Sequence, residues 1–461
     1  HALGLFSAMN TDAVSSIDFY KGAAPAKYGG KLSSVIDMRM KEGNKQEFHG
    51  SASVGTMESR LVLEGPIVKD KASFMISGRK GYGILAKKAL DLIDLDNNHS
   101  RDDVNFSDYC GKLNWTINDA NKLYVSAYYS KDKFKYALLR QDNKHTWGNK
   151  TGTLRWNHIF DDNRFSNLTL TFSDYDYVQR QERDRRRFNW EAGMQEWCAK
   201  YDIDSYSKNG SHLTYGGRLE YHHYRPGEIV PSSPESTIAP MKIGEKDMLV
   251  AGLYFGNEFK LRERLSLNAG MNVTLSSTLG GKSKSYINAE PRISASYAVT
   301  DNMSLKASYA HTAQYQHLLN NSALGLPTDI WAPADSKIKP QQADQVSVGI
   351  HSTIKEGYGF LSGIEWSAEV YAKLMHNIID FKSPKKFCMF HYDIRTSIDS
   401  RQTMQYLGIK VRRNDLYNFI PCIFSLLALT PRIVKVHPIL IGKFTLSCLI
   451  KHFQCYSAIR I

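Results

Sequence analysis

The segment LSLNAGMNVTL (residues 265–275) places apolar and polar side chains alternately along the chain. Successive side chains of a β-strand point to opposite faces, so this segment predicts a strand with one apolar and one polar face. Similar alternation recurs at 168–173, 212–221 and 364–370. Several such runs last about 10 to 15 residues, whereas strands of globular proteins centre on about 5 or 6. A tilted strand that crosses a bilayer needs about 9 to 11 residues, so the pattern favours membrane-spanning strands.

The connections between these strands alternate in length. Short turns, rich in Asn, Asp, Gly or charged residues, fall near 118–121, 161–163, 208–210, 262–264 and 301–302. Long polar segments lie between them, at 81–103, 136–148, 179–194, 226–246 and 315–340. Outer-membrane barrels have this rhythm, with short periplasmic turns and long external loops. The chain is therefore predicted to be all-β, with about 15 long antiparallel meander strands in a transmembrane β-barrel.

The first 45 residues contain two short β-segments joined by a glycine-bearing turn. The first, IDFYKG, ends at Lys21 and Gly22, and the second is LSSVIDMRMK (residues 32–41). Between them, PAKYGG contains Tyr28, Gly29 and Gly30. The two adjacent glycines permit tight backbone geometry that a residue with a Cβ atom resists. We therefore expect a strand, a turn and a second strand.

This hairpin resembles the C-terminal end of the plug domain of TonB-dependent outer-membrane receptors. In that family a strand ending in Lys-Gly leads through a Tyr-Gly turn to the last plug strand and into the barrel. FHGSASVG (residues 48–55), EPR (290–292) and KPQQ (339–342) are similar to barrel segments of the family. The resemblance covers residues 10–381 and implies a 22-stranded barrel filled by the plug. It also implies that an inner-membrane energy-coupling complex pulls on a segment N-terminal to the plug, and that opening is an order–disorder change without covalent catalysis.

The resemblance divides the chain into three parts. Residues 1–45 are expected to be the C-terminal end of the plug domain, 46–381 a partial outer-membrane barrel, and 382–461 a tail outside the barrel pattern. The tail holds 13 of the 59 Lys and Arg residues, 3 of the 46 acidic residues and four of the six Cys. The body is thus nearly neutral despite the net charge of +13, which argues against a nucleic-acid partner.

We expect the basic, Cys-rich tail to be translated out of frame or otherwise foreign to the barrel, with a genuine C-terminal module as the alternative. The chain would then be a fragment that lacks the coupling segment and several barrel strands, and it would not transport.

One charge cluster stands out in the body, and we find no catalytic or metal motif. Arg183, Arg185, Arg186 and Arg187 lie in a predicted external loop, where they could contact lipopolysaccharide phosphates or an anionic ligand. A solvated loop of mixed charge is the alternative. The acidic segment 94–105 departs from a calcium loop, because His99 stands where such a loop needs Gly. We therefore predict no catalytic residue, cofactor or metal, and the spacing of Cys110 and Cys198 does not show whether they pair.

The function expected from these features is active uptake of a large, scarce ligand by a receptor in the outer membrane of a Gram-negative cell. Outer-membrane lipid, lipopolysaccharide and an unidentified ligand would be its partners, and the full-length family adds the energy-coupling complex. A passive outer-membrane channel or structural barrel is one alternative, although a plug-like hairpin argues against it. A soluble all-β glycan-binding protein or enzyme is the other.

Overall fold

The computed structural model describes residues 10–20, 22–55, 57–82, 103–138, 141–183, 185–280, 283–319, 330–353, 365–379 and 402–412. These residues are almost entirely β-structure, and a 3-10 turn, Thr11–Ala13, precedes the first strand. Among them, no helix is long and apolar enough to cross a membrane.

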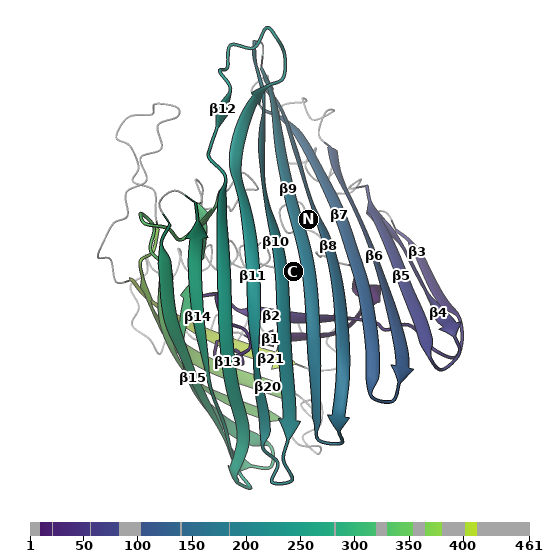
Figure 1. Cartoon of the computed structure of the whole chain (residues 1–461), viewed down its shortest axis with the longest axis vertical. Coiled ribbons are helices and arrows are strands. Elements are labelled where there is room, and N and C mark those ends of the chain that lie inside the picture. Colours follow the sequence, from purple (N-terminus) through teal and green to yellow (C-terminus); the bar gives the residue numbers. More distant parts are fainter. Residues whose placement is uncertain are drawn as a thin grey trace, which may run out of the picture.

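Sixteen strands of this part of the chain form one antiparallel sheet that curves into a barrel (Figure 1). Neighbouring strands follow the order of the chain, and β21 lies next to β3. The strands are β3 (His49–Val54), β4 (Glu58–Val68), β5 (Ala72–Gly81), β6 (Asp103–Asn118), β7 (Asn121–Leu138), β8 (Gln141–Asp161), β9 (Arg164–Arg183), β10 (Arg186–Tyr206), β11 (His212–Pro231), β13 (Lys246–Arg262), β14 (Leu265–Leu279), β15 (Ser285–Thr300), β16 (Met303–Gln314), β19 (Gln341–Thr353), β20 (Glu365–His376) and β21 (Gln402–Arg412). The short β12 (Met241–Lys242) pairs with β11 at the top of Figure 1.

The prediction of long antiparallel meander strands in a partial barrel is confirmed, with sixteen strands against the 22 that the family resemblance implies. β8 and β10 each contain 21 residues, about twice the length that a bilayer crossing requires.

The barrel exposes apolar side chains on its outer wall and buries polar ones, which is the reverse of a soluble protein. On β14, Met271 is 45% exposed and Leu275 46%, whereas Asn272 and Thr274 between them are fully buried. Leu253 on β13 and Ile287 on β15 are even more exposed. Alternating residues thus place the apolar set on the outer wall and the polar set in the lumen. This distribution argues against the soluble alternative, because a soluble sandwich would bury its apolar face.

Several predicted boundaries differ from the structure. The segment 179–194 was expected to be a loop, but β9 ends at Arg183 and β10 begins at Arg186, and β7 and β8 likewise extend into 136–148. Polar strands continue to pair beyond the apolar band, since their backbone groups still gain hydrogen bonds there. The segment 315–340 contains two strands, and β21 comes from the tail that was expected to lie outside the barrel.

Two further strand pairs are separate from the barrel sheet. β1 (Val14–Tyr20) and β2 (Val35–Met40) pair antiparallel and lie across the barrel strands in Figure 1. They form the strand–turn–strand predicted for the N-terminal region, and their connecting loop enters the lumen. β17 (Gln316–Leu319) and β18 (Ile330–Pro333) form the second pair, which packs against β10, β11 and β13.

Candidate functional site

The loop between β1 and β2 is held inside the barrel by a buried arginine of β15. Nη1 of Arg292 donates to the backbone oxygens of Ala24 (3.0 Å), Pro25 (2.9 Å) and Tyr28 (2.8 Å). Only 6% of the Arg292 residue surface is exposed. Hydrogen bonds from an ionised donor are stronger than neutral ones. Arg292 therefore fixes the course of this loop, which we call the plug loop (residues 22–34).

Glu290 balances the charge of Arg292 on the same strand. Its Oε2 lies 3.0 Å from Nη2 of Arg292, and its Oε1 accepts from the Gly30 amide at 3.4 Å. Residues two apart on a strand point to the same face, so EPR directs both charged side chains into the lumen. Glu290 is fully buried, and loss of one partner of such a pair commonly costs about 3–5 kcal/mol because the other charge remains buried.

Polar residues of the neighbouring strands complete this anchor. Nδ2 of Asn272 on β14 donates to the oxygen of Ala26 at 2.8 Å. Thr274 donates to Oδ1 of Asn272 at 2.8 Å and accepts from Arg218 of β11 at 3.3 Å. Asn272, like Arg292, thus bonds to the backbone of the plug loop, and Thr274 and Arg218 support Asn272 from the barrel wall.

Two glycines of the plug loop are required by this geometry. A Cβ atom on Gly29 would lie 2.5 Å from Nδ2 of Asn272, the atom that bonds to Ala26. Gly30 has a φ of +79°, in the left-handed region that favours glycine. A Cβ atom on Gly22 would meet the flexible end of Gln345, so the close approach there is easily relieved. Lys21 lies outside the described residues.

Tyr28 joins the plug loop to β2. Its hydroxyl donates to Oδ2 of Asp37 at 2.7 Å, and its ring lies 5.6 Å from that of Tyr20. The ammonium groups of Lys27 and Lys200 lie 5.0 and 5.7 Å from the ring centroid, within the range of cation–π attraction. Burial, and then the hydrogen bond to Asp37, raise the pKa of Tyr28 well above its usual value. The phenol therefore remains a neutral donor to the carboxylate.

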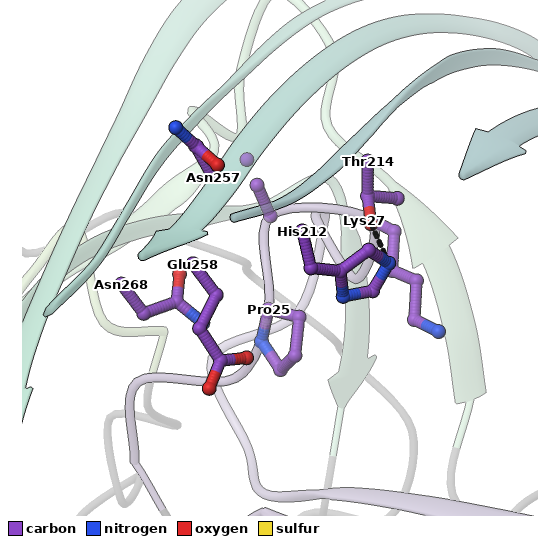
Figure 2. Close-up of a pocket in the computed structure, with 9 residues that line it drawn as sticks. Pro25, Lys27, His212, Thr214, Asn257, Glu258 and Asn268 are labelled. Carbon is purple, nitrogen blue, oxygen red and sulfur yellow. Dashed lines mark hydrogen bonds between the residues drawn. The ribbon is translucent and has the colours of Figure 1, made fainter. Parts of the chain in front are cut away.

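A small pocket lies beside the plug loop (Figure 2). Pro25 and Lys27 come from the loop, and the barrel side is lined by His212, Thr214, Asn257, Glu258 and Asn268. Its volume of about 90 Å³ is well below the roughly 300–1,000 Å³ of sites for small organic ligands. In the part of the chain that the structure describes, no group of three or more His, Cys, Asp or Glu residues is placed to hold a metal ion.

The arginine cluster lies elsewhere, at the tip of the β9–β10 hairpin. Arg185, Arg186 and Arg187 are exposed there, while the side chain of Arg183 lies outside the described residues. The backbone oxygens of Arg185 and Arg187 accept hydrogen bonds from Thr237 and Ser232. Contact with lipopolysaccharide or an anionic ligand stays a prediction. Cys110 and Cys198 are both free thiols.

The lumen residues that hold the plug loop were not identified as a site from the sequence. Glu290 and Arg292 entered the prediction only as a family-like motif, and Arg218, Asn272 and Thr274 only as polar positions of alternating segments. The available signal was their position: each lies on the polar face of a strand long enough to cross a bilayer.

Comparison with protein families matched residues 81–391 to the TonB dependent receptor-like β-barrel. Comparison with curated proteins gave no match. Similar solved structures include the alcaligin outer-membrane receptor FauA from Bordetella pertussis (TM-score 0.59, 15% identity, 88% of this chain and 64% of that one). The copper transporter OprC is another similar structure (TM-score 0.62, 11% identity, 81% of this chain and 61% of that one). The siderophore receptor PirA from Acinetobacter baumannii is also similar (TM-score 0.59, 15% identity, 86% and 62%).

The chain therefore spans less than two thirds of the length of each of these structures, and identities this low show the fold alone. The family match covers more than half of the 461 residues, and the chain belongs to the TonB-dependent receptor family.

Proposed function

We propose that this chain forms the end of the plug and much of the barrel of an outer-membrane receptor that imports a large, scarce ligand into a Gram-negative cell. The observation that carries this proposal is the plug loop bound in the lumen by Arg292. A segment bonded in the lumen narrows the open path that a passive channel needs, so it favours a receptor that must be opened. Similar structures named as siderophore receptors or a copper transporter support uptake as the class of function, without transferring a ligand.

The anchor suits a plug that is released by force. Arg292 bonds three backbone oxygens through one nitrogen, so displacement of a short loop would break these bonds together. The freed guanidinium keeps Glu290 as its partner, so opening leaves no uncompensated buried charge. The barrel is therefore built to lose the plug loop without losing its own internal pairing. An energy-coupling complex in the full-length receptor would supply the force.

Two variants in planar bilayers test the proposal. Arg292→Met removes the anchor, whereas Arg264→Met removes a guanidinium of the β13–β14 turn that donates to the backbone oxygen of Val299 on β15 at 3.4 Å. Conductance is recorded while urea is raised, after unheated gel electrophoresis has confirmed a folded barrel. We expect Arg292→Met to conduct at clearly lower urea than wild type and Arg264→Met to match wild type. Equal urea thresholds for both variants would show that the lumen is not closed by the anchored loop.

Localisation is tested separately. Membranes of a Gram-negative host expressing the chain are separated by density, and the proposal requires the protein in the outer-membrane fraction, migrating anomalously on gels until boiled.

A further inference from the structure

The β17–β18 hairpin is fastened to one side of the barrel wall. Tyr315, just before β17, packs in a buried cluster with Tyr224, Met248 and Val250 of β11 and β13, and Trp331 of β18 packs against it. Ile330 of β18 packs against a second aromatic cluster, built from β9, β10 and β11. Hairpins of this size have little stability of their own, so these contacts hold β17–β18 in place.

The same hairpin also contacts the plug loop. Nζ of Lys31 donates to Oε1 of Gln316 at 3.0 Å. Beside it, the Leu32 amide donates at 3.2 Å to Oε1 of Gln314, which is the last residue of barrel strand β16. Nε2 of Gln314 in turn donates to the backbone oxygen of Gln316 at 2.7 Å. The bonds of Lys31 and Leu32 thus join residues more than 280 positions apart in the sequence.

Gln316 uses both ends of its side-chain amide. Its oxygen faces Lys31, while its nitrogen lies 2.9 Å from Nδ1 of His222 on β11. His222 is itself flanked by Glu196 and Glu220, each 3.3 Å from a ring nitrogen. Gln316 is 95% buried, and a buried polar network is sensitive to the loss of any one member.

We propose that β17–β18 is a strap that couples the plug loop to the β10–β11 wall through Gln316. When the strap moves, Lys31 loses its acceptor, and when the plug loop moves, the Gln316 side-chain oxygen loses its donor. Coupling of this kind is reciprocal by thermodynamic necessity. A ligand that displaces the strap would thereby loosen the plug loop, with no direct contact to that loop.

Hydrogen exchange on the full chain in detergent micelles tests the strap without any ligand. Gln316→Leu removes the amide and is expected to speed exchange of plug-loop peptides about tenfold or more, since hydrogen bonds to charged groups are among the stronger ones. Lys31→Met, an exposed position, is expected to speed exchange of residues 316–319 and 330–333. Lys31→Arg should restore slow exchange. Gln342→Leu is the matched control, because that glutamine donates to Asn288 of the barrel wall.

The strap is refuted if each variant changes only the segment that carries it, because reciprocity would then be absent. It is also refuted if Gln342→Leu has the same effect on the plug loop, because the effect would then be general softening of the barrel. If Gln316→Leu does not give a heat-shifted gel band, Lys31→Met alone decides the question. None of these outcomes depends on transport, so the exchange experiment tests the strap even if the proposed uptake function is wrong.

Discussion

Lowering the pH from 7 to 5 should loosen the β17–β18 strap, because His317 is buried there with no hydrogen-bond partner among the residues that the structure describes. The residue is 1% exposed, and neither ring nitrogen has a hydrogen bond. Burial lowers the pKa of His317 to about 4, although the nearby Asp335 carboxylate opposes the shift. Burial would raise the pKa of Asp335, but its ion pair with Lys246 and two backbone amides lower it overall, so Asp335 stays charged across this range. Within the strap, His317 is therefore the group whose protonation changes as the pH falls.

The direction and size of the change in strap stability with pH follow from the difference between the His317 pKa in the packed and the opened strap. The pKa in the packed strap lies below the usual value of about 6.5, so an opened strap binds more protons between the two values. Packing is most stable above pH 6.5 and weakens as the pH falls toward 4. Between pH 7 and pH 5 the loss is about 2 kcal/mol, at about 1.4 kcal/mol per pKa unit. The open population should therefore rise roughly twenty-fold.

The rate of amide hydrogen exchange in residues 316–319, corrected for the intrinsic effect of pH on exchange, measures this rise in the open population. His317→Leu keeps an apolar side chain in the cavity and removes the titration, so its exchange should change little between pH 7 and 5. A wild-type response equal to that of His317→Leu would refute the reasoning, since some other group would then carry the pH dependence.

Three substitutions test the plug loop, each read as the rate of hydrogen exchange in residues 22–40. Gly29→Ala drives a Cβ atom into Asn272 and should destabilise the loop by about 1–3 kcal/mol, whereas Gly152→Ala, where a Cβ atom meets open space, should leave the loop unchanged. Gly30→Ala should cost about 1–2 kcal/mol from its positive φ, while Gly280→Ala, also at positive φ and in open space, should leave plug-loop exchange at the wild-type rate. Tyr28→Phe removes the donor to Asp37 and should cost about 1–2 kcal/mol, with acceleration centred on β2; no change would mean that water replaces the hydroxyl fully.

The barrel could be predicted from the sequence because alternation and strand length are local properties. The apolar and the polar face of residues 265–275 can be read from that segment alone, and the short turns show where strands reverse direction. The two strands within 315–340 were missed because their stability comes from distant contacts, such as Trp331 against the β11–β13 cluster. β21 was missed because Leu407, Ile409 and Val411 alternate over only a few residues within a stretch of different composition.

The anchor escaped prediction for a different reason. Alternation tells which side chains face the lumen, but Asn272 and Asn268 look alike in sequence, and only the first bonds to the plug loop. The distinction depends on where the loop runs in space. The Tyr28-Gly29-Gly30 turn was noticed because glycine and aromatic residues are conspicuous, yet the reason for Gly29 became visible only with Asn272 beside it.

Arg292 grips peptide oxygens and not the side chains of Ala24, Pro25 or Tyr28. Such a grip places little demand on the amino acids it holds, provided that the chain bends in the same way. Plugs of diverged sequence could therefore be exchanged between barrels that keep the arginine, and chimaeric receptors built at this junction should assemble.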